Sequence, residues 1–267
     1  MTQGLPRTRF NSAGLVRTLA ELAVADAAEP RQSFAERLGA WLDFKEALAL
    51  YAALNSTAAG APEGRSAKAA PPAAVAMREE LARVRGDLAQ SIAAVDAAPA
   101  SGTSLAADSA AGLPSVPDAL AHAAADAVAN PAEPDFAPLH RHYMTQQRRL
   151  AAVVGPLRAR MRAELGRQSA ALKQLAALDA VMEQALAARE AGLLAQVPVL
   201  LGGRFARLFE AHGGAADGDA AGWLQPGGWL ARFCAEMQQV LLAELDLRLM
   251  PVAGLVAALD TESTERE

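Results

Sequence analysis

The sequence predicts an all-α protein, built as an antiparallel helical bundle or as helical hairpins with kinked long helices and disordered Ala/Pro/Gly-rich linkers. Three observations predict this class. From His140 to Ala191, apolar residues recur in steps of three and four, the spacing that lines one face of an α-helix. Much of the 52% hydrophobic content is alanine, which favours helix but buries little apolar surface. Aromatic residues are only 4%, so we expect thin, leucine-centred packing.

Residues 1–55 are predicted to form an N-terminal helical module. Asn11 or Ser12 is a candidate cap for its first helix. Ser33 and Glu36 have the spacing of a capping box for a second helix, and Asp43 restarts the helical pattern. Several of the few aromatic residues lie in this region, which predicts a small unit packed around them.

Two low-complexity stretches separate the next elements. Residues 56–72 and 98–117 are rich in Ala, Gly, Pro and Ser and have no apolar period, which is typical of flexible linkers. Between them, residues 73–97 return to a helical pattern with charged residues on the other faces. We expect a single helix there.

A helical domain is predicted over residues 118–260. Asp118 is positioned to cap a short helix that ends near Ala129. The central stretch follows, and Gly155-Pro156 inside it predicts a kink or a break because proline cannot donate a helical hydrogen bond. Gly166 is a second possible turn point. Folding back at either place gives an αα-hairpin that buries its two apolar stripes together.

The C-terminal part contains a short helix and a long one. The short helix lies between Gly202-Gly203 and Gly213-Gly214. Pro226-Gly227-Gly228 opens the long helix, and Pro251 is expected to stop it. Its apolar face is wide enough to suggest burial on two sides, within the fold or in an oligomer. After a last apolar turn, residues 261–267 are predicted to be a disordered tail.

A basic run stands out in a chain whose net charge is −5. Between Arg141 and Lys173 lie eight cations and one acid, Glu164. Such a run can bind nucleic acid, an anionic membrane surface or an acidic partner helix. Our candidate residues for that surface are Arg148, Arg149, Arg158, Arg160, Arg162 and Arg167.

Two other interpretations of the same run stay open. The arginines can be solvated helix faces. They can also pair internally with acids elsewhere, such as Asp118, Asp126, Glu133, Asp135, Asp179 or Glu183. Nucleic acid is the less favoured ligand, partly because no stacking aromatic residues accompany the arginines.

Other candidate sites have simpler structural explanations. His140 and His142 lack the i, i+4 spacing of helical metal ligands, so we interpret them as a surface pair. The loop at residues 213–219 lacks the acids of an EF-hand. Trp223 and Trp229 are assigned to the core rather than to a membrane or partner anchor. No catalytic, metal-binding or cofactor-binding residues are predicted.

Three segments resemble a known family. They are the run Arg31 to Leu38 followed by Trp41-Leu42, the segment Val154 to Arg160, and the run Ala243 to Leu249 followed by Pro251. Together they resemble a proteobacterial family known as domain of unknown function 3348. The resemblance implies no activity and no catalytic residues. It implies a link to an assembly at the cell envelope and nothing sharper.

These observations favour a non-enzymatic cytoplasmic protein. We expect no signal peptide and no transmembrane helix, because the sequence shows no signal-peptide pattern at its start and no apolar run of about 18 residues. The lone Cys234 suits a buried position in a reducing compartment. We therefore predict an adaptor or assembly factor that binds a protein partner or forms a homo-oligomer. The alternative is a module that binds nucleic acid or an anionic membrane through residues 141–173, with peripheral membrane contact.

Overall fold

The computed structural model describes residues 14–22, 34–55, 71–93, 116–213 and 220–264. Every regular element in these ranges is an α-helix, which confirms the predicted all-α class. The predicted caps at Asn11, Ser12 and Ser33 lie outside the described residues. The helices are α1 (Gly14–Glu21), α2 (Phe34–Trp41), α3 (Phe44–Asn55), α4 (Pro71–Ala93), α5 (Val116–Ala127), α6 (Ala137–Leu165), α7 (Ala170–Leu194), α8 (Val197–Ala211), α9 (Ala220–Trp223) and α10 (Trp229–Thr264).

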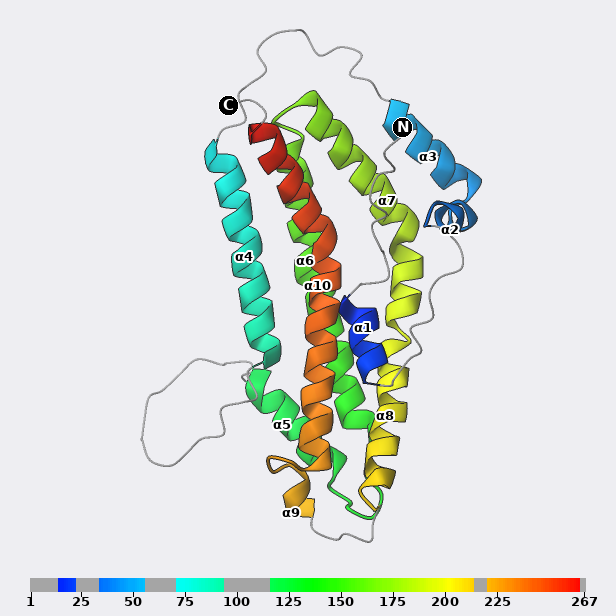
Figure 1. The fold of residues 1–267 in the computed structure, drawn as a ribbon, viewed down its shortest axis with the longest axis vertical. Helices are drawn as coiled ribbons and strands as arrows, with labels where there is room; N and C mark the ends of the chain where they lie inside the picture. The colour runs from blue at the N-terminus through cyan, green and yellow to red at the C-terminus, as the bar shows by residue number, and fades with distance from the viewer. Residues whose placement is uncertain (1–13, 23–33, 56–70, 94–115, 214–219, 265–267) are drawn as a thin grey trace, which may run out of the picture.

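Four long columns form an elongated bundle (Figure 1). They are α4, α6, the near-continuous α7 and α8, and α10. The columns α6 and α10 run from the α9 end to the opposite end, whereas α4 and the α7–α8 column run the other way. The shorter α5 and α9 lie at one end of the bundle, and α1 lies across α10 beside α8.

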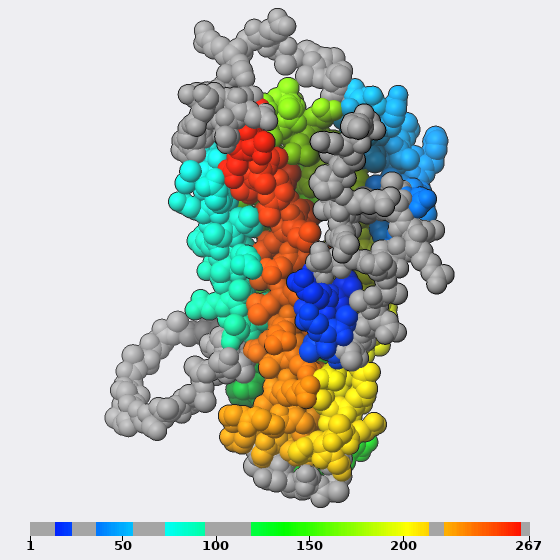
Figure 2. Space-filling model, viewed as in Figure 1, coloured from blue at the N-terminus to red at the C-terminus, as the bar shows by residue number. Residues whose placement is uncertain are grey.

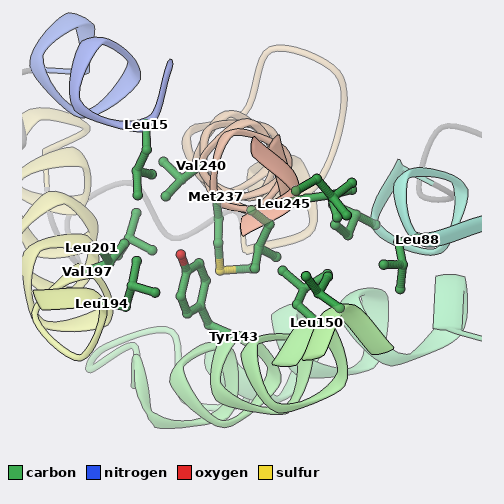
Figure 3. Packing of buried hydrophobic residues seen from close by; sticks show 14 of the residues in the cluster. Leu15, Leu88, Tyr143, Leu150, Leu194, Val197, Leu201, Met237, Val240 and Leu245 are labelled. Atoms are coloured by element: carbon green, nitrogen blue, oxygen red, sulfur yellow. The ribbon is translucent and has the colours of Figure 1, made fainter. Parts of the chain in front are cut away.

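Helix α10 is the central column. It packs against α1, α4, α6, α7 and α8, so its wide apolar face is buried within the fold. Its buried residues include Leu230, Phe233, Met237, Val240 and Leu241. Figure 3 shows Met237, Val240 and Leu245 facing side chains from α1, α6, α7 and α8.

A kink or a break was predicted at Gly155-Pro156, and the break is absent, because α6 continues without interruption through Pro156. The physical reason is that Pro156 and Ala152 both lie on the exposed side of the helix. Water can therefore satisfy the carbonyl of Ala152 that Pro156 leaves unpaired. The buried Val154 and Leu157 anchor the helix on both sides of this position. The chain folds back at Gly166 instead, the second turn point predicted, and Ser169 caps α7 by accepting a hydrogen bond from the backbone N–H of Leu172.

The predicted stop at Pro251 is also wrong. Helix α10 passes through Pro251 and ends at Thr264. Its apolar stripe continues beyond the proline through the buried Val252, Leu255, Val256 and Leu259, so burial outweighs one lost hydrogen bond.

The predicted disordered tail at residues 261–267 is correspondingly wrong for residues 261–264, which are helical. Contacts at the end of α10 hold this segment. Asp260 pairs with Arg78, and the Ser169 hydroxyl donates to Glu262. Residues 265–267 lie outside the described part of the chain.

The N-terminal helices do not form a unit around their own aromatic residues. Helix α1 packs on α10 through Leu15 and Leu19, whereas α3 packs on α7. Phe44 and Tyr51 are exposed, so the predicted aromatic core is wrong for these two residues. The restart at Asp43 is confirmed, since Asp43 and Glu46 exchange hydrogen bonds in a capping box at the start of α3.

Other boundaries shift by a few residues. Helix α4 spans 71–93 where 73–97 was predicted, and α5 begins at 116 where 118 was predicted. Most of the two predicted linkers lies outside the described residues. Helix α8 begins at Val197 and includes Gly202, where a Cβ atom would lie 3.2 Å from the Phe136 ring. The helix ends before Gly213, whose φ of +98° matches the predicted glycine C-cap.

Candidate functional site

The central part of the predicted basic surface is an internal ion-pair cluster. The Arg158 guanidinium donates two hydrogen bonds to Asp179, at 2.8 and 2.6 Å. Arg162 lies 2.9 Å from Asp179 and 2.6 Å from Glu183. Because α6 and α7 run side by side after the turn at Gly166, these charges join the two arms of the hairpin.

The cluster is held within the protein rather than in bulk solvent. The side chains of Arg158 and Asp179 are each 13% exposed. Burial acts to raise the pKa of Asp179, but the hydrogen bonds from Arg158 and Arg162 outweigh it and lower that pKa below its ordinary value. Asp179 and Glu183 were among the internal partners considered from the sequence. That pairing is therefore present in the structure.

Two more candidate arginines also have acidic partners. Arg160 on α6 lies 2.6 Å from Glu80 on α4, and Arg167 lies 2.8 Å from Glu164. Four of the six candidate residues thus have their charge balanced inside this chain.

The other two candidates, Arg148 and Arg149, are exposed. Within the described residues their guanidinium groups have no ion-pair or hydrogen-bond partner, and the same holds for Arg141. Of the six candidate arginines, the two without a partner therefore both lie in the N-terminal half of α6.

A buried polar network lies where α6, α7 and α10 meet. Glu244 is fully buried. Its carboxylate accepts hydrogen bonds from Tyr143 at 2.8 Å, Gln147 at 2.9 Å and Arg248 at 2.9 Å. Gln147 also donates to the backbone carbonyl of Leu194, at the end of α7. Burial, followed by the nearby charge of Glu244, raises the pKa of the Tyr143 hydroxyl far above its ordinary value.

A second carboxylate joins α8 to α10. Glu236 accepts hydrogen bonds from Arg204 at 2.8 and 2.7 Å and from Arg232 at 2.9 Å. Burial acts to raise the pKa of Glu236, but the two arginines outweigh it and lower that pKa. Each of these two carboxylates, Glu244 and Glu236, is paired with at least one arginine. Their contacts join neighbouring helices, which is a structural role.

The two histidines of α6 and the single cysteine are partly or fully buried. His140 and His142 are both half-buried near the start of α6, and burial lowers the pKa of His142. Burial raises the pKa of the Cys234 thiol to about 12, which keeps it protonated at neutral pH. No group of three or more His, Cys, Asp or Glu residues in the described ranges is arranged to hold a metal ion.

The two C-terminal tryptophans belong to an aromatic cluster at the α9 end of the bundle. Trp223 and Trp229 are buried, with their ring centroids 5.6 Å apart, and Phe205 and Phe209 pack against Trp229. Their assignment to the core is confirmed. Within the described part of the chain, neither buried indole N–H has a hydrogen-bond partner.

The largest exposed apolar side chains are gathered on α3. Phe44 is 85% exposed, Leu48 56% and Tyr51 65%. At positions i, i+4 and i+7 they form one stripe along the helix, which we call the α3 stripe. The half-buried and buried residues of α3 are Glu46, Leu50 and Ala53, which lie on the opposite side. The α3 stripe therefore points away from α7.

Weak docking contacts hold α3 in this orientation. The Gln174 side chain donates a 2.7 Å hydrogen bond to the carbonyl of Leu54. At the other end of the α2–α3 pair, the Trp41 ring lies between two guanidinium groups, 5.1 Å from Arg37 and 4.8 Å from Arg189. Figure 1 shows α3 at the edge of the molecule, outside α7. The space-filling view also places α3 at the rim of the molecule (Figure 2).

Helices α7 and α8 contain a long apolar segment, most of which is not buried in the bundle. The segment Ala170–Ala211 is long and apolar enough to cross a membrane, and 22% of its most apolar window is buried. The sequence expectation of no transmembrane helix stays a prediction, because this match rests on length and composition. These are the only grounds for a span, and α7 carries Asp179 and Glu183 in ion pairs with α6.

The sequence interpretation missed the α3 stripe and the Glu244 network. The i, i+4, i+7 spacing of the stripe was visible, but it was assigned to a core. A single acid among leucines was visible at Glu244, and its partners 97 and 101 residues away were not.

Residues 1–261 match the model of the family described as "Protein of unknown function (DUF3348)", so the chain belongs to this family. Searches of curated proteins and of solved structures found no significant match.

Proposed function

We propose that this member of the DUF3348 family is an adaptor that binds a protein partner through the α3 stripe. The observation that carries the proposal is the orientation of α3. A surface helix ordinarily turns its apolar face toward the core. Here the two aromatic residues Phe44 and Tyr51 are on the outer face, and only Ala53 is fully buried on the inner one.

The stripe is large enough to mark an interaction site. Aromatic side chains bury about 150–250 Å² each in interfaces. With Leu48, the stripe presents on the order of 400 Å² of apolar surface, within the range of patches that mark binding sites on monomeric proteins. Aromatic anchors of this kind dominate the free energy of many protein interfaces.

The partner surface is expected to be apolar and helical. Ala47 and Ala52 lie on the two sides of the stripe, so a second helix can approach it closely. The capping box of Asp43 and Glu46 fixes the start of α3 before binding, which lowers the conformational entropy lost on association.

The proposed setting is a cytoplasmic complex, linked to the cell envelope on the family resemblance alone. The buried free thiol of Cys234 supports a reducing compartment. The role proposed is binding, without catalysis.

Affinity purification from the native cell tests the proposal. The test variant replaces Phe44, Leu48 and Tyr51 with Gln, which keeps α3 helical. The matched control replaces three exposed apolar residues on other helices, Val75, Val199 and Met250, with Gln. We expect one reproducible partner with the wild type and the control, and its loss with the α3 variant.

The captured partner is then purified, and its Kd is measured directly. The α3 variant is expected to weaken binding at least about tenfold, or about 1.4 kcal/mol. Light scattering identifies a second copy of this chain as the partner if the oligomer disappears only in the α3 variant. A partner retained by the α3 variant, or the absence of any partner and of any oligomer, would contradict the proposal.

A further inference from the structure

The three arginines of α6 that have no partner differ from the other arginines of the structure. Every other arginine in the described ranges has at least one ion-pair, hydrogen-bond, ring or electrostatic partner. Arg141, Arg148 and Arg149 have none, and all three are exposed. We call these three residues the α6 triad.

The triad lies on a stretch that contains no negative charge. Helix α6 has no acidic residue before Glu164. Arg141 and Arg148 are seven residues apart, which is about 10 Å along the helix and on the same side of it. Arg149 lies next to Arg148, rotated by about 100°. Three guanidinium groups thus lie within about two turns of the helix, and no acid in the described ranges pairs with them.

From this arrangement we propose that the α6 triad binds the anionic headgroups of a lipid bilayer. Charge complementarity is the first reason, since an anionic surface attracts unpaired cations within a Debye length of about 8 Å. Within the described residues no acid forms an ion pair with these three arginines, so their positive charge is available to such a surface.

The residues around the triad favour lipid over the other anionic partners. None of the large hydrophobic side chains exposed in the described residues belongs to α6, so the triad lacks the apolar anchor that protein interfaces require. Tyr143 is the only aromatic residue in the helix apart from its histidines, and it is fully buried. The triad therefore offers no stacking platform for nucleic-acid bases.

Vesicle sedimentation tests this inference with the full-length protein. The probes are vesicles of phosphatidylcholine alone and vesicles containing 30% phosphatidylserine, about the fraction that gives a strongly negative surface. The wild type is expected to bind only the second kind, and high salt is expected to abolish binding. Each arginine contributes about fivefold to the partition coefficient, so replacing all three with Gln is expected to reduce it by about 100-fold.

A matched variant distinguishes the effect of the α6 triad on vesicle binding from the effect of the total charge of the protein. Arg78, Arg83 and Arg85 on α4 are also exposed but paired with Asp260, Asp87 and Asp246. Replacing these three with Gln removes the same charge and is expected to leave vesicle binding within about twofold of wild type. The α3 variant described above is also expected to bind vesicles normally, so failure of either proposal is distinguishable from failure of the other.

Several results would overturn the inference. They are no binding of the wild type to phosphatidylserine vesicles, equal binding to both vesicle types, or an equal loss in the α4 control. Binding of a 20-base-pair DNA duplex in place of vesicles would assign the triad to nucleic acid instead. Circular dichroism of both triple variants confirms that each is folded as the wild type is.

Discussion

The hydroxyl of Tyr143 donates a 2.8 Å hydrogen bond to the carboxylate of Glu244, and the two residues are 101 positions apart in the chain. Both are fully buried, one on α6 and one on α10. A buried charge is tolerated only where it is paired and hydrogen-bonded. Glu244 meets that condition through Tyr143, Gln147 and Arg248, so the network fixes how the two columns are aligned along their length.

Replacing Glu244 with Ala is expected to lower the free energy of unfolding by about 3–5 kcal/mol, because Arg248, Gln147 and Tyr143 would lose their shared acceptor in the interior. Glu244→Gln keeps an acceptor oxygen and should cost less. Urea denaturation followed by circular dichroism measures both. The control is Glu79→Ala at an exposed position of α4, expected within about 0.5 kcal/mol of wild type. A Glu244→Ala variant as stable as this control would contradict the role of Glu244 in aligning α6 and α10.

Acid is expected to weaken the α6–α7 hairpin. The pKa of Asp179 is lower in the folded protein than its ordinary value of 3.8. Its contribution to stability is therefore complete above pH 3.8 and is lost as the pH falls through the folded-state pKa. Unfolding free energies measured from neutral pH downward should fall more steeply for wild type than for Asp179→Asn. If the unfolding free energies of the two proteins fell in parallel with pH, the stabilising role of the Asp179 carboxylate would be contradicted.

Gly228 is expected to tolerate no side chain. A Cβ atom there would overlap the backbone carbonyls of Gly222 and Trp223, just before α10 begins. Gly228→Ala should lower the free energy of unfolding by about 1–3 kcal/mol and change the fluorescence of the neighbouring tryptophans. Gly254→Ala is the control, because no atom lies within 4 Å of its added Cβ. That substitution inside α10 should stabilise by about 0.5–1 kcal/mol. Equal effects at the two glycines would refute the steric explanation.

Trp41 is expected to hold the α2–α3 pair on α7. Removing its ring in Trp41→Ala eliminates the contacts with Arg37 and Arg189, each worth about 0.5–1 kcal/mol at exposed sites. Amide hydrogen exchange in α3 should become several-fold faster, while exchange in α6 and α10 should not change. Phe44→Ala, at an 85% exposed position, serves as the control and should leave exchange in α3 as it is. Unchanged α3 exchange in Trp41→Ala would show that other contacts hold the pair.

Helical periodicity predicted most of the fold, and its errors have a common physical cause. Local sequence predicts interruptions at Pro156 and Pro251, yet α6 and α10 continue through them because apolar residues on either side are buried against other columns. Local sequence indicates the cost of a proline in a helix. It does not indicate the tertiary packing that exceeds this cost.

The candidate site was harder to predict because charge pairing is a long-range property. The run from Arg141 to Lys173 is strongly basic in sequence, but Arg158 and Arg162 meet their acids only after the chain turns at Gly166. Arg160 meets an acid 80 residues earlier. The α3 stripe was missed because its spacing alone does not tell whether it is buried or exposed. Its spacing is that of a buried face, and only the packed structure shows which face of α3 meets α7.

The position of α10 also has a consequence for synthesis. This helix follows every other described helix in the chain, and yet α1, α4, α6 and α8 all pack on it. At about 5–20 residues per second, a ribosome needs on the order of 10–40 s to travel from α1 to α10. During that interval the earlier helices have no central column to cover their leucines. The nascent protein therefore depends on its last helix to complete the bundle, and loss of the residues after Pro251 would leave part of that interior exposed.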